Sequence, residues 1–340
     1  MLRVAINGYG RIGRSVLRAL YEGGYRDQIQ VVAINELSDL ETISYLTRYH
    51  TTHGRFPQDV RTEQDKLIVA DDEIQVLAHE DPDDIDWQAL NIDLLLECSG
   101  SFSTLEKAQS YIDAGVPRLL LSQPADADAQ STIVYGFNHK HILSEQKIIS
   151  AASCTTNCLI PVLDGLMSLV GVEHGTTQTI HSAMNDQPVI DAYHTKDLRL
   201  TRAALSSIIP VDTGLAKGIS RMLPDLGGKI ACNAVRVPTL NVSVIDMVVR
   251  THKPVTVERV NEYFKLLAET KYAGILGYSE EAHASVDFNH DPRSVIIDAT
   301  QTQVVDGRLV KLLCWFDNEW AYANRMLDVA VYWAQKLQEK

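Results

Sequence analysis

The chain carries NGYGRIGR at Asn7–Arg14, directly after the apolar run Arg3–Ile6 and before a segment with helical periodicity. Its glycines Gly8, Gly10 and Gly13 have the spacing of the turn that joins a strand to a helix in dinucleotide-binding folds. The first permits the tight turn, the second lets the backbone approach a pyrophosphate, and the third allows close helix–strand packing. N–H groups at the start of the helix would then face the phosphates.

A hexapeptide of this kind also occurs as a plain tight turn, so its context matters. The apolar run Gln30–Ile34 is followed by Asn35 and Glu36, about 20 residues beyond Gly13. A carboxylate there accepts hydrogen bonds from a ribose 2′-hydroxyl and repels a 2′-phosphate. The pattern predicts NAD binding, with NAD favoured over NADP. The alternative for Glu36 is a solvated acidic residue at the end of a strand.

The first part of the chain, residues 1–150, alternates short apolar runs with helix-like segments, which is typical of βαβ units and a parallel sheet. The apolar runs are Arg3–Ile6, Gln30–Ile34, Asp93–Glu97, Arg118–Leu121 and Ile148–Ile149. Ser15–Glu22 has the pattern of a helix, and we expect it to end at Gly23 and Gly24, where glycine can adopt the left-handed cap conformation.

After Cys154 the pattern changes to longer β-branched runs with few helices between them, which favours a mostly antiparallel sheet. The expected strands are Asn241–Arg250, Ser285–Phe288, Val295–Asp298 and Leu309–Phe316. Helices are expected over Thr256–Thr270 and, with an amphipathic pattern, over Tyr322–Leu337.

These patterns predict an α/β chain with two domains. The first, over residues 1–152, is a doubly wound parallel sheet of the Rossmann type that binds NAD. The second, over residues 153–317, is an α+β domain built on a mostly antiparallel sheet. The C-terminal helix, within residues 318–340, is expected to pack back on the first domain.

The composition, with 45% hydrophobic and 22% charged residues, is typical of a globular protein with a real core. The formal net charge of −13 would repel phosphates, so we expect no nucleic-acid partner and no acidic membrane surface. No apolar run approaches the ~18 residues of a membrane helix. The segment Met1–Ile6 runs straight into a strand-like pattern, without the apolar core of a signal peptide.

The chain has five cysteines and no CxxC pair, so neither a disulfide framework nor a zinc ribbon is expected. We predict no metal site. A cytoplasmic, reducing location fits these thiols best.

One cysteine stands in a setting that favours reactivity. The sequence SAASCTTNC at Ser150–Cys158 follows a strand-like run and begins a predicted helix. Ser153 suits the N-cap, which places Cys154 in the first turn, where the helix dipole favours a negative group. A helix N-terminus and a neighbouring imidazolium lower the pKa of a thiol and favour a reactive thiolate. Cysteine is also a common small buried hydrophobe, and that alternative fits Cys98 and Cys232.

A base for this thiol cannot be found from proximity in the sequence. Among the eleven histidines, His181 ends the strand-like segment Thr179–His181 and precedes a polar loop. Its position alone is equally compatible with a structural histidine.

Four motifs together resemble the glyceraldehyde-3-phosphate dehydrogenase family. They are NGYGRIGR at Asn7–Arg14, SCTTNC at Ser153–Cys158, RVPT at Arg236–Thr239 and DNEW at Asp317–Trp320, and the similarity runs over essentially the whole chain. The resemblance implies a Rossmann domain, a catalytic domain and a C-terminal helix that returns to the first domain. It also implies a homotetramer that binds NAD and a small phosphorylated aldehyde.

The resemblance assigns roles to individual residues. Cys154 would be the nucleophile, and His181 the base that activates it. Asn318 and the pair Arg11 and Ile12 would lie at the NAD, with the three glycines and Glu36. The contacts to the substrate or its phosphate would come from Ser153, Thr155, Thr213, Gly214 and Arg236. In the implied chemistry the Cys154 thiolate adds to the aldehyde, and loss of a hydride to NAD leaves a thioester.

The stretch after His181 resembles the branch of the family that acts on D-erythrose 4-phosphate, in which water hydrolyses the thioester to 4-phosphoerythronate. That branch implies a role in making pyridoxal 5′-phosphate. The glyceraldehyde branch usually carries a threonine where Met184 stands, and its hydroxyl helps to hold inorganic phosphate. Losing one hydrogen bond to a charged group costs roughly 1.5–3 kcal/mol, which favours water as the acyl acceptor. The alternative is packing variation at Met184, with another group holding phosphate.

Other positions do not decide which phosphorylated aldehyde is the substrate. Leu200 stands where both branches usually place a phosphate-binding arginine, and Arg199 and Arg202 are out of register with it. Gly214 fits the glyceraldehyde branch equally well, so a phosphorylating glyceraldehyde-3-phosphate dehydrogenase is the nearest alternative. A nucleotide-binding regulator without turnover is the third hypothesis, and the intact nucleophile and base oppose it.

Overall fold

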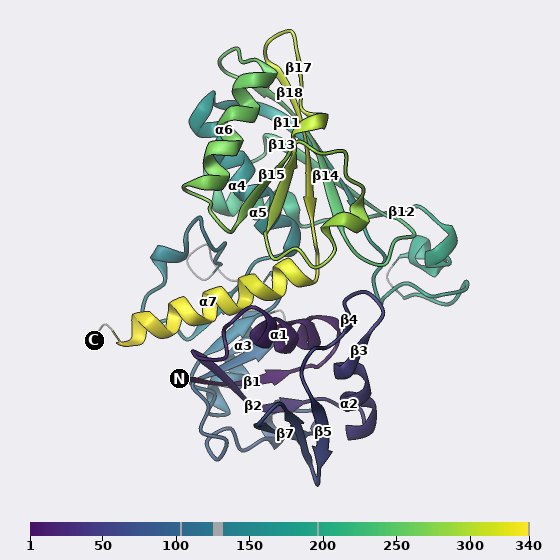
Figure 1. Ribbon diagram of the computed structural model, residues 1–340, viewed down its shortest axis with the longest axis vertical. Helices are drawn as coiled ribbons and strands as arrows, with labels where there is room; N and C mark the ends of the chain where they lie inside the picture. Colours follow the sequence, from purple (N-terminus) through teal and green to yellow (C-terminus); the bar gives the residue numbers. More distant parts are fainter. Residues whose placement is uncertain (103, 125–131, 196, 339–340) are drawn as a thin grey trace. The chain divides into compact units, whose positions relative to one another are not determined.

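The computed structural model describes residues 1–102, 104–124, 132–195 and 197–338. The chain divides into two compact units. One comprises Met1–Ser153 with Ala323–Lys340, and the other comprises Cys154–Tyr322. Each unit is built on its own sheet, and the ribbon in Figure 1 labels several strands of each.

The first unit has a sheet with the strand order β10-β9-β8-β1-β2-β7-β6-β5. Its strands are β1 (Leu2–Asn7), β2 (Ile29–Asn35), β5 (Val60–Glu63), β6 (Lys66–Val69), β7 (Asp72–Leu77), β8 (Leu94–Glu97), β9 (Leu119–Leu121) and β10 (Ile148–Ser150). Neighbours from β10 to β7 are parallel, whereas β6 and β5 are added antiparallel at one edge. Counted along the chain, the parallel strands have the order 3-2-1-4-5-6 of a Rossmann sheet. The predicted doubly wound parallel sheet is confirmed.

Helices cover both faces of this sheet. They are α1 (Arg11–Glu22), α2 (Leu40–Arg48) and α3 (Leu105–Asp113), joined by α7 (Trp320–Gln338) from Ala323 onward, while β3 (Tyr49–His50) and β4 (Gly54–Arg55) form a separate hairpin. Gly13 of α1 lies against Ile6, whereas Ala108 and Tyr111 of α3 pack in a buried cluster with Ala5. Ala5 and Ile6 are successive residues of β1 and point to opposite faces. The helices α1 and α3 therefore lie on opposite sides of the sheet.

The second unit has a sheet with the order β12-β13-β11-β14-β18-β16-β15, and β17 also pairs with β18. Its strands are β11 (Val172–His181), β12 (Ile209–Val211), β13 (Ile230–Arg236), β14 (Ser243–Thr251), β15 (Leu276–Ser279), β16 (Val295–Asp298), β17 (Gln303–Val305) and β18 (Leu309–Phe316). Only the pairs β11–β13 and β15–β16 are parallel among these described strands. The prediction of a mostly antiparallel second sheet is confirmed.

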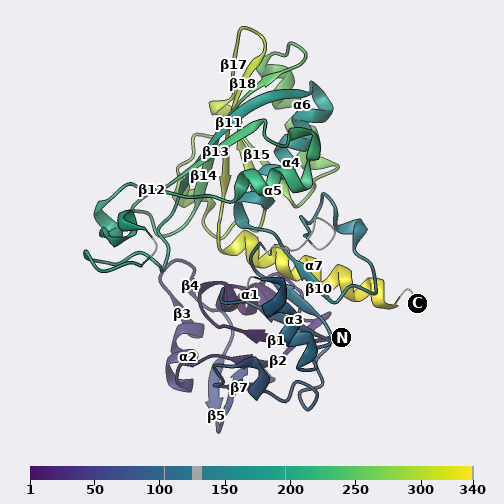
Figure 2. The same ribbon diagram turned by 180° about the vertical axis from the view of Figure 1, so that it is seen from behind.

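The helices of the second unit are α4 (Cys154–Leu169), α5 (Leu215–Met222) and α6 (Val257–Glu269). Figures 1 and 2 show all three on the same side of the sheet. Glycines allow close approach: a Cβ at Gly165 of α4 would lie 2.9 Å from a Leu267 methyl of α6. A Cβ at Gly218 of α5 would lie 2.7 Å from Oγ1 of Thr156 in α4. The N-terminal turns of α4 and α5 are therefore adjacent.

One predicted strand is wrong. Ser285–Phe288 forms a short 3-10 helix instead. The carboxylate of Asp287 accepts a hydrogen bond from the backbone N–H of Ala284 at 2.8 Å, which closes the turn. Phe288 packs in a buried cluster with Val242 and Ile296, so tertiary burial outweighs the alternating pattern of this segment.

Candidate active site

The glycine turn after β1 meets the demands of a pyrophosphate-binding loop. Gly8 has a φ of +83°, and a Cβ there would lie 2.4 Å from the Ser99 backbone after β8. A Cβ at Gly13 would lie 2.2 Å from the carbonyl oxygen of Gly8. In contrast, a Cβ at Gly10 would meet no atom within 4 Å. The first and third glycines are thus needed for packing, while the backbone at the second is open to a ligand.

The surroundings of this turn also fit NAD. Glu36 follows β2, and its Oε2 accepts a hydrogen bond from the backbone N–H of Tyr9 at 2.7 Å. A carboxylate has about four acceptor positions, so this bond leaves capacity for a ribose hydroxyl. Helix α1 begins at Arg11 and Ile12, and its N-cap Gly10 makes no side-chain cap. Backbone N–H groups at such a helix start attract phosphate.

A buried polar network joins the ends of β1 and β8, where the strand order reverses direction. Glu97 is fully buried, and its Oε2 accepts hydrogen bonds from Asn7 Nδ2 and from the Tyr111 hydroxyl, both at 2.6 Å. Its Oε1 accepts from the backbone N–H of Ser99 at 2.7 Å. A buried carboxylate with this many donors is well satisfied and rigid. It fixes the crevice in which a dinucleotide binds in such sheets.

Cys154 and His181 meet in the second unit. Cys154 is the first residue of α4 and His181 the last of β11, and the cysteine Sγ lies 3.9 Å from the histidine Nε2. The histidine Nδ1 lies 2.8 Å from the carbonyl oxygen of Ser182. Since a carbonyl only accepts, Nδ1 carries the hydrogen and Nε2 presents its lone pair to the thiol. This geometry can take up the thiol proton.

The other four cysteines have a different character. Burial raises the pKa of the Cys98, Cys158 and Cys314 thiols well above the usual range, and raises that of Cys232 as well. All five cysteines are free of disulfides. The four buried or half-buried thiols stay protonated at neutral pH.

The turn that leads into α4 has a strained backbone. Strand β10 ends at Ser150, and Ala152 has a φ of +60° while only 2% exposed. A left-handed conformation is unfavourable for alanine, and such strain is common at functional sites. The turn places Ser153 directly before the helix and Thr155 in its first turn.

A second helix start lies beside that of α4. Thr213 and Gly214 immediately precede α5, and Thr213 Oγ1 accepts a hydrogen bond from the N–H of Leu215 at 3.2 Å. A Cβ at Gly214 would meet no atom within 4 Å, so the backbone there is accessible. Because the first turns of α4 and α5 are adjacent, their positive dipole ends together favour an anion.

Arg236 ends β13 directly opposite His181 in the parallel pairing of β13 with β11. Its guanidinium forms an ion pair with Asp186, in the loop after β11. The arginine side chain is 12% exposed and that of Asp186 is 46% exposed. The sheet thus brings a cationic group next to the Cys154–His181 pair.

Comparison with known families agrees with this geometry. Residues 2–105 match the glyceraldehyde 3-phosphate dehydrogenase NAD binding domain, and residues 153–318 match the C-terminal domain of the same enzyme. The chain belongs to the glyceraldehyde 3-phosphate dehydrogenase family. It is an NAD-dependent oxidoreductase that acts on a phosphorylated aldehyde sugar. The predictions of NAD as cofactor and of this enzyme class are confirmed.

Asn318, which the family resemblance assigns to the cofactor, is held in the second unit. Its Oδ1 accepts hydrogen bonds from the hydroxyls of Ser182 at 3.0 Å and of Ser243 at 2.8 Å. The preceding residue, Asp317, is fully buried and caps α7 by accepting from the N–H groups of Glu319 and Trp320 at 2.9 and 2.7 Å.

Among the described residues near Leu200, neither neighbouring arginine is placed as an obvious replacement for the arginine that the family resemblance implies there. Leu200 lies in a 3-10 helix, Leu198–Thr201, on which Arg199 is exposed. Arg202 forms an exposed ion pair with Asp191 at 2.9 Å.

Sequence reasoning missed several residues that shape this dehydrogenase site. They are Ser182, Asp186, Ser243 and Asp317. Asp317 lies three residues before the start of α7 and accepts the N–H groups that lead into it, and aspartate is a typical acceptor in such turns, so it could have been found from the motif itself. Asp186 lies 50 residues from its partner Arg236, and Ser182 lies 136 residues from Asn318. No local pattern connects residues so far apart.

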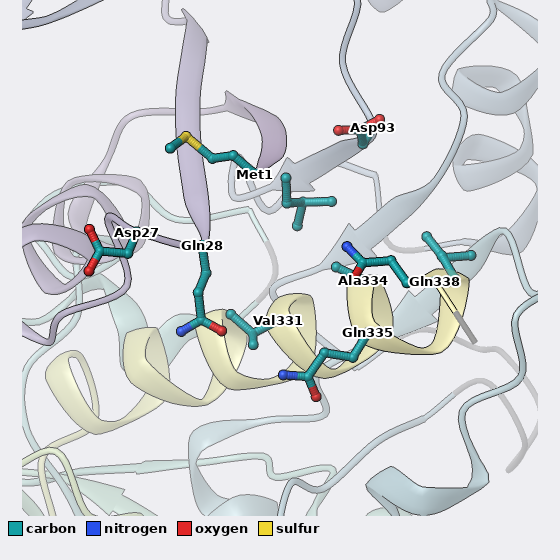
Figure 3. A pocket seen from close by; sticks show the side chains of 10 residues that line it. Met1, Asp27, Gln28, Asp93, Val331, Ala334, Gln335 and Gln338 are labelled. Carbon is teal, nitrogen blue, oxygen red and sulfur yellow. The ribbon is translucent and has the colours of Figure 1, made fainter. Parts of the chain in front are cut away.

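A pocket of about 460 Å³ lies elsewhere in the first unit (Figure 3). Leu2, Gln28 and Asp93 line it, and these residues lie at or before the starts of β1, β2 and β8. It is therefore at the opposite end of the parallel sheet from the glycine turn. None of the described residues that line it is a lysine or arginine, which argues against a phosphate ligand.

The described residues offer neither a metal-binding cluster nor a membrane-spanning helix. They contain no group of three or more His, Cys, Asp or Glu side chains placed to hold a metal ion. None of the described helices combines the length and the apolar character that crossing a membrane requires.

Proposed function

We propose that this dehydrogenase oxidises D-erythrose 4-phosphate to 4-phosphoerythronate, through a thioester on Cys154 that water hydrolyses. Cys154 is the nucleophile and His181 the general base. The 3.9 Å separation of Sγ and Nε2, with Nδ1 bonded to the Ser182 carbonyl, supports this pairing. The product would serve the synthesis of pyridoxal 5′-phosphate.

In the proposed reaction the proton of the Cys154 thiol passes to His181 Nε2, and the thiolate adds to the aldehyde carbon. The oxyanion that forms is held by the backbone N–H of Cys154 at the start of α4 and by His181. Bound NAD supplies the acceptor for the hydride that leaves this carbon. His181 then releases the thiol proton to solvent and takes a proton from the attacking water, and the Cys154 thiolate leaves as the acid is released.

The phosphate of the substrate would be held by groups of the second unit and the turn before it. They are Ser153, Thr155, Thr213, Gly214 and Arg236. The adjacent starts of α4 and α5 and the largely buried guanidinium of Arg236 support an anion site here. The NAD contacts would come from Gly8, Gly10, Arg11, Ile12, Gly13, Glu36 and Asn318.

The assignment of erythrose 4-phosphate as the substrate rests on Met184. It lies in the loop after β11, where its backbone N–H donates to Gln187 Oε1 at 2.9 Å and its carbonyl accepts from the Gln187 N–H at 3.0 Å. Its half-buried thioether takes the place of the hydroxyl that the glyceraldehyde branch usually carries. A thioether is at best a weak acceptor and cannot donate to inorganic phosphate. Water is then the favoured acyl acceptor.

Initial rates of NADH formation at 340 nm test this proposal, with each of the two aldehydes and with or without inorganic phosphate. We expect erythrose 4-phosphate to be oxidised without added phosphate. Faster oxidation of glyceraldehyde 3-phosphate that depends on phosphate would instead support the phosphorylating enzyme. Gly214 is equally compatible with this second function.

We also propose that the enzyme is a cytoplasmic homotetramer. The loop after β11 exposes large apolar side chains, which a second copy of the chain would cover. They are Val189 and Ile190, with exposed fractions of 72% and 77%, and Leu198 and Ile208, with 83% and 70%. Light scattering should give four times the chain mass of 37.8 kDa. Five free cysteines fit a reducing compartment.

A further inference from the structure

The carboxamide of Asn318 is fixed in one orientation by two serines. Asn318 is 5% exposed, Ser182 is fully buried, and Ser243 is 1% exposed. Both hydroxyls donate to Oδ1 of the asparagine, at 3.0 and 2.8 Å. The Ser243 oxygen also accepts the backbone N–H of Ser182 at 3.1 Å, which ties this hydroxyl to the main chain beside the other serine. The two hydroxyls together hold the amide with its oxygen toward them.

This orientation leaves the amide nitrogen of Asn318 for another partner. No acceptor for its Nδ2 hydrogens occurs among the described residues. A ligand that offers an acceptor at this position would complete the hydrogen bonding of the amide. The complementary group is a carbonyl oxygen, such as that of a carboxamide.

Ser182 links this amide to the catalytic base. Its backbone carbonyl accepts from His181 Nδ1 at 2.8 Å, while its hydroxyl holds Asn318. The base therefore depends on the main chain at position 182, and the amide depends on the side chain. Replacement of the side chain alone separates the two roles.

The backbone around these residues is strained in a way that favours a functional role. Val242, directly before Ser243, has a φ of +63°, and His290 has a φ of +70°. A left-handed conformation is a true outlier for a β-branched residue. The carboxylate of Asp317 holds both segments, since its Oδ2 accepts from Asn241 Nδ2 at 2.8 Å and from the N–H of His290 at 2.7 Å. Strain of this kind persists only where the surroundings enforce it.

We propose that Ser182 and Ser243 are positioning residues that set the nicotinamide for hydride transfer by orienting the carboxamide of Asn318. The proposal rests on the assignment of Asn318 to NAD under the proposed function. With its oxygen held by the two hydroxyls, Asn318 presents N–H to the carbonyl of the nicotinamide carboxamide. Rotation of the Asn318 amide would present oxygen to oxygen and misplace the ring.

A double-mutant cycle tests this idea with Ser182→Ala, Asn318→Ala and the double variant, measured as kcat/KM for NAD+. Ser182→Ala should lower this value about five- to tenfold, as expected for the loss of one hydrogen bond. Asn318→Ala should lower it further, and the double variant should equal Asn318→Ala. The KM for the aldehyde should stay unchanged in Ser182→Ala.

Two controls separate positioning from general damage. Iodoacetamide should inactivate Ser182→Ala at the wild-type rate, because the carbonyl that orients His181 remains. Ser44→Ala, which removes the hydroxyl of a 4% exposed serine in α2, should keep wild-type kinetics. Additive losses in the cycle, a raised aldehyde KM, or an unaffected Ser182→Ala would overturn the proposal. The cycle can be run with either aldehyde, so its outcome does not depend on which one is the natural substrate. A wrong substrate assignment would be detected by the separate comparison of rates with and without phosphate.

Discussion

Arg236 and Asp186 form an ion pair beside Cys154 and His181, although the sequence separates them by 50 residues. The guanidinium is only 12% exposed, so its charge is poorly screened by water. A substrate phosphate would compete with the carboxylate of Asp186 for the same N–H groups. Under the proposed function, the carboxylate of Asp186 therefore occupies the guanidinium when no substrate is bound.

We therefore expect Asp186→Asn to lower the KM for the phosphorylated aldehyde about three- to tenfold, because a neutral amide competes less well with phosphate. Steady-state kinetics at constant ionic strength measure this. Asp191→Asn is a matched control, since Asp191 pairs with the exposed Arg202 and should leave KM unchanged. A raised KM in Asp186→Asn would show that the carboxylate supports binding instead.

Glu36 should determine the choice of cofactor. Glu36→Gln keeps an acceptor for the Tyr9 N–H but removes the charge, so the KM for NAD+ should rise about tenfold. Activity with NADP+ should rise, because the 2′-phosphate is no longer repelled. Initial rates with both cofactors test this, with Glu41→Gln in the first turn of α2 as the control. Unchanged discrimination would show that Glu36 does not face the ribose.

The thiol pKa values predict selective alkylation. Burial raises the pKa of the other cysteines, so they remain protonated and unreactive near pH 7. Iodoacetamide should therefore label Cys154 alone at pH 7, with other sites appearing only at alkaline pH. His181→Asn should slow this labelling about tenfold and shift its pH profile upward, since the imidazolium no longer stabilises the thiolate. Peptide mass mapping identifies the labelled cysteines. Labelling of several cysteines at pH 7 would contradict the predicted selectivity for Cys154.

Much of the architecture follows from patterns within short stretches of sequence. The glycine turn, the expected strand Leu309–Phe316 and the helix expected over Thr256–Thr270 depend on local spacing, and the structure has β18 at the same residues and α6 over Val257–Glu269. The hairpin of β5 and β6 and the neighbouring β7 were not predicted. β5 and β6 are only four residues long, and β5 and β7 contain two charged residues each, so hydrophobic periodicity is weak there.

The site was predictable only in part. Cys154 was singled out because its helix-start position is a local feature, whereas His181 needed the family resemblance. The partners Ser182 and Ser243 lie 61 residues apart and meet only through the pairing of strands. Such contacts depend on the register of the sheet, which no sequence period specifies.

The hydroxyl missing at position 184 can be restored. With glyceraldehyde 3-phosphate as substrate, Met184→Thr should increase about tenfold the factor by which inorganic phosphate accelerates NADH formation. The reason is that the hydroxyl adds a donor for the attacking anion. Met184→Leu, which changes packing without adding a donor, is the matched control. Rates measured across a phosphate series test this. Equal responses of the two variants would show that Met184 does not control the acyl acceptor.

The covalent role of Cys154 is tested most directly by Cys154→Ala, with Cys232→Ser as the control for a half-buried thiol outside the site. The measurement is the rate of NADH formation from erythrose 4-phosphate. We predict a loss on the order of 1000-fold or more for Cys154→Ala and little change for Cys232→Ser. A Cys154→Ala enzyme that retained more than about one tenth of the wild-type rate would contradict the thioester mechanism.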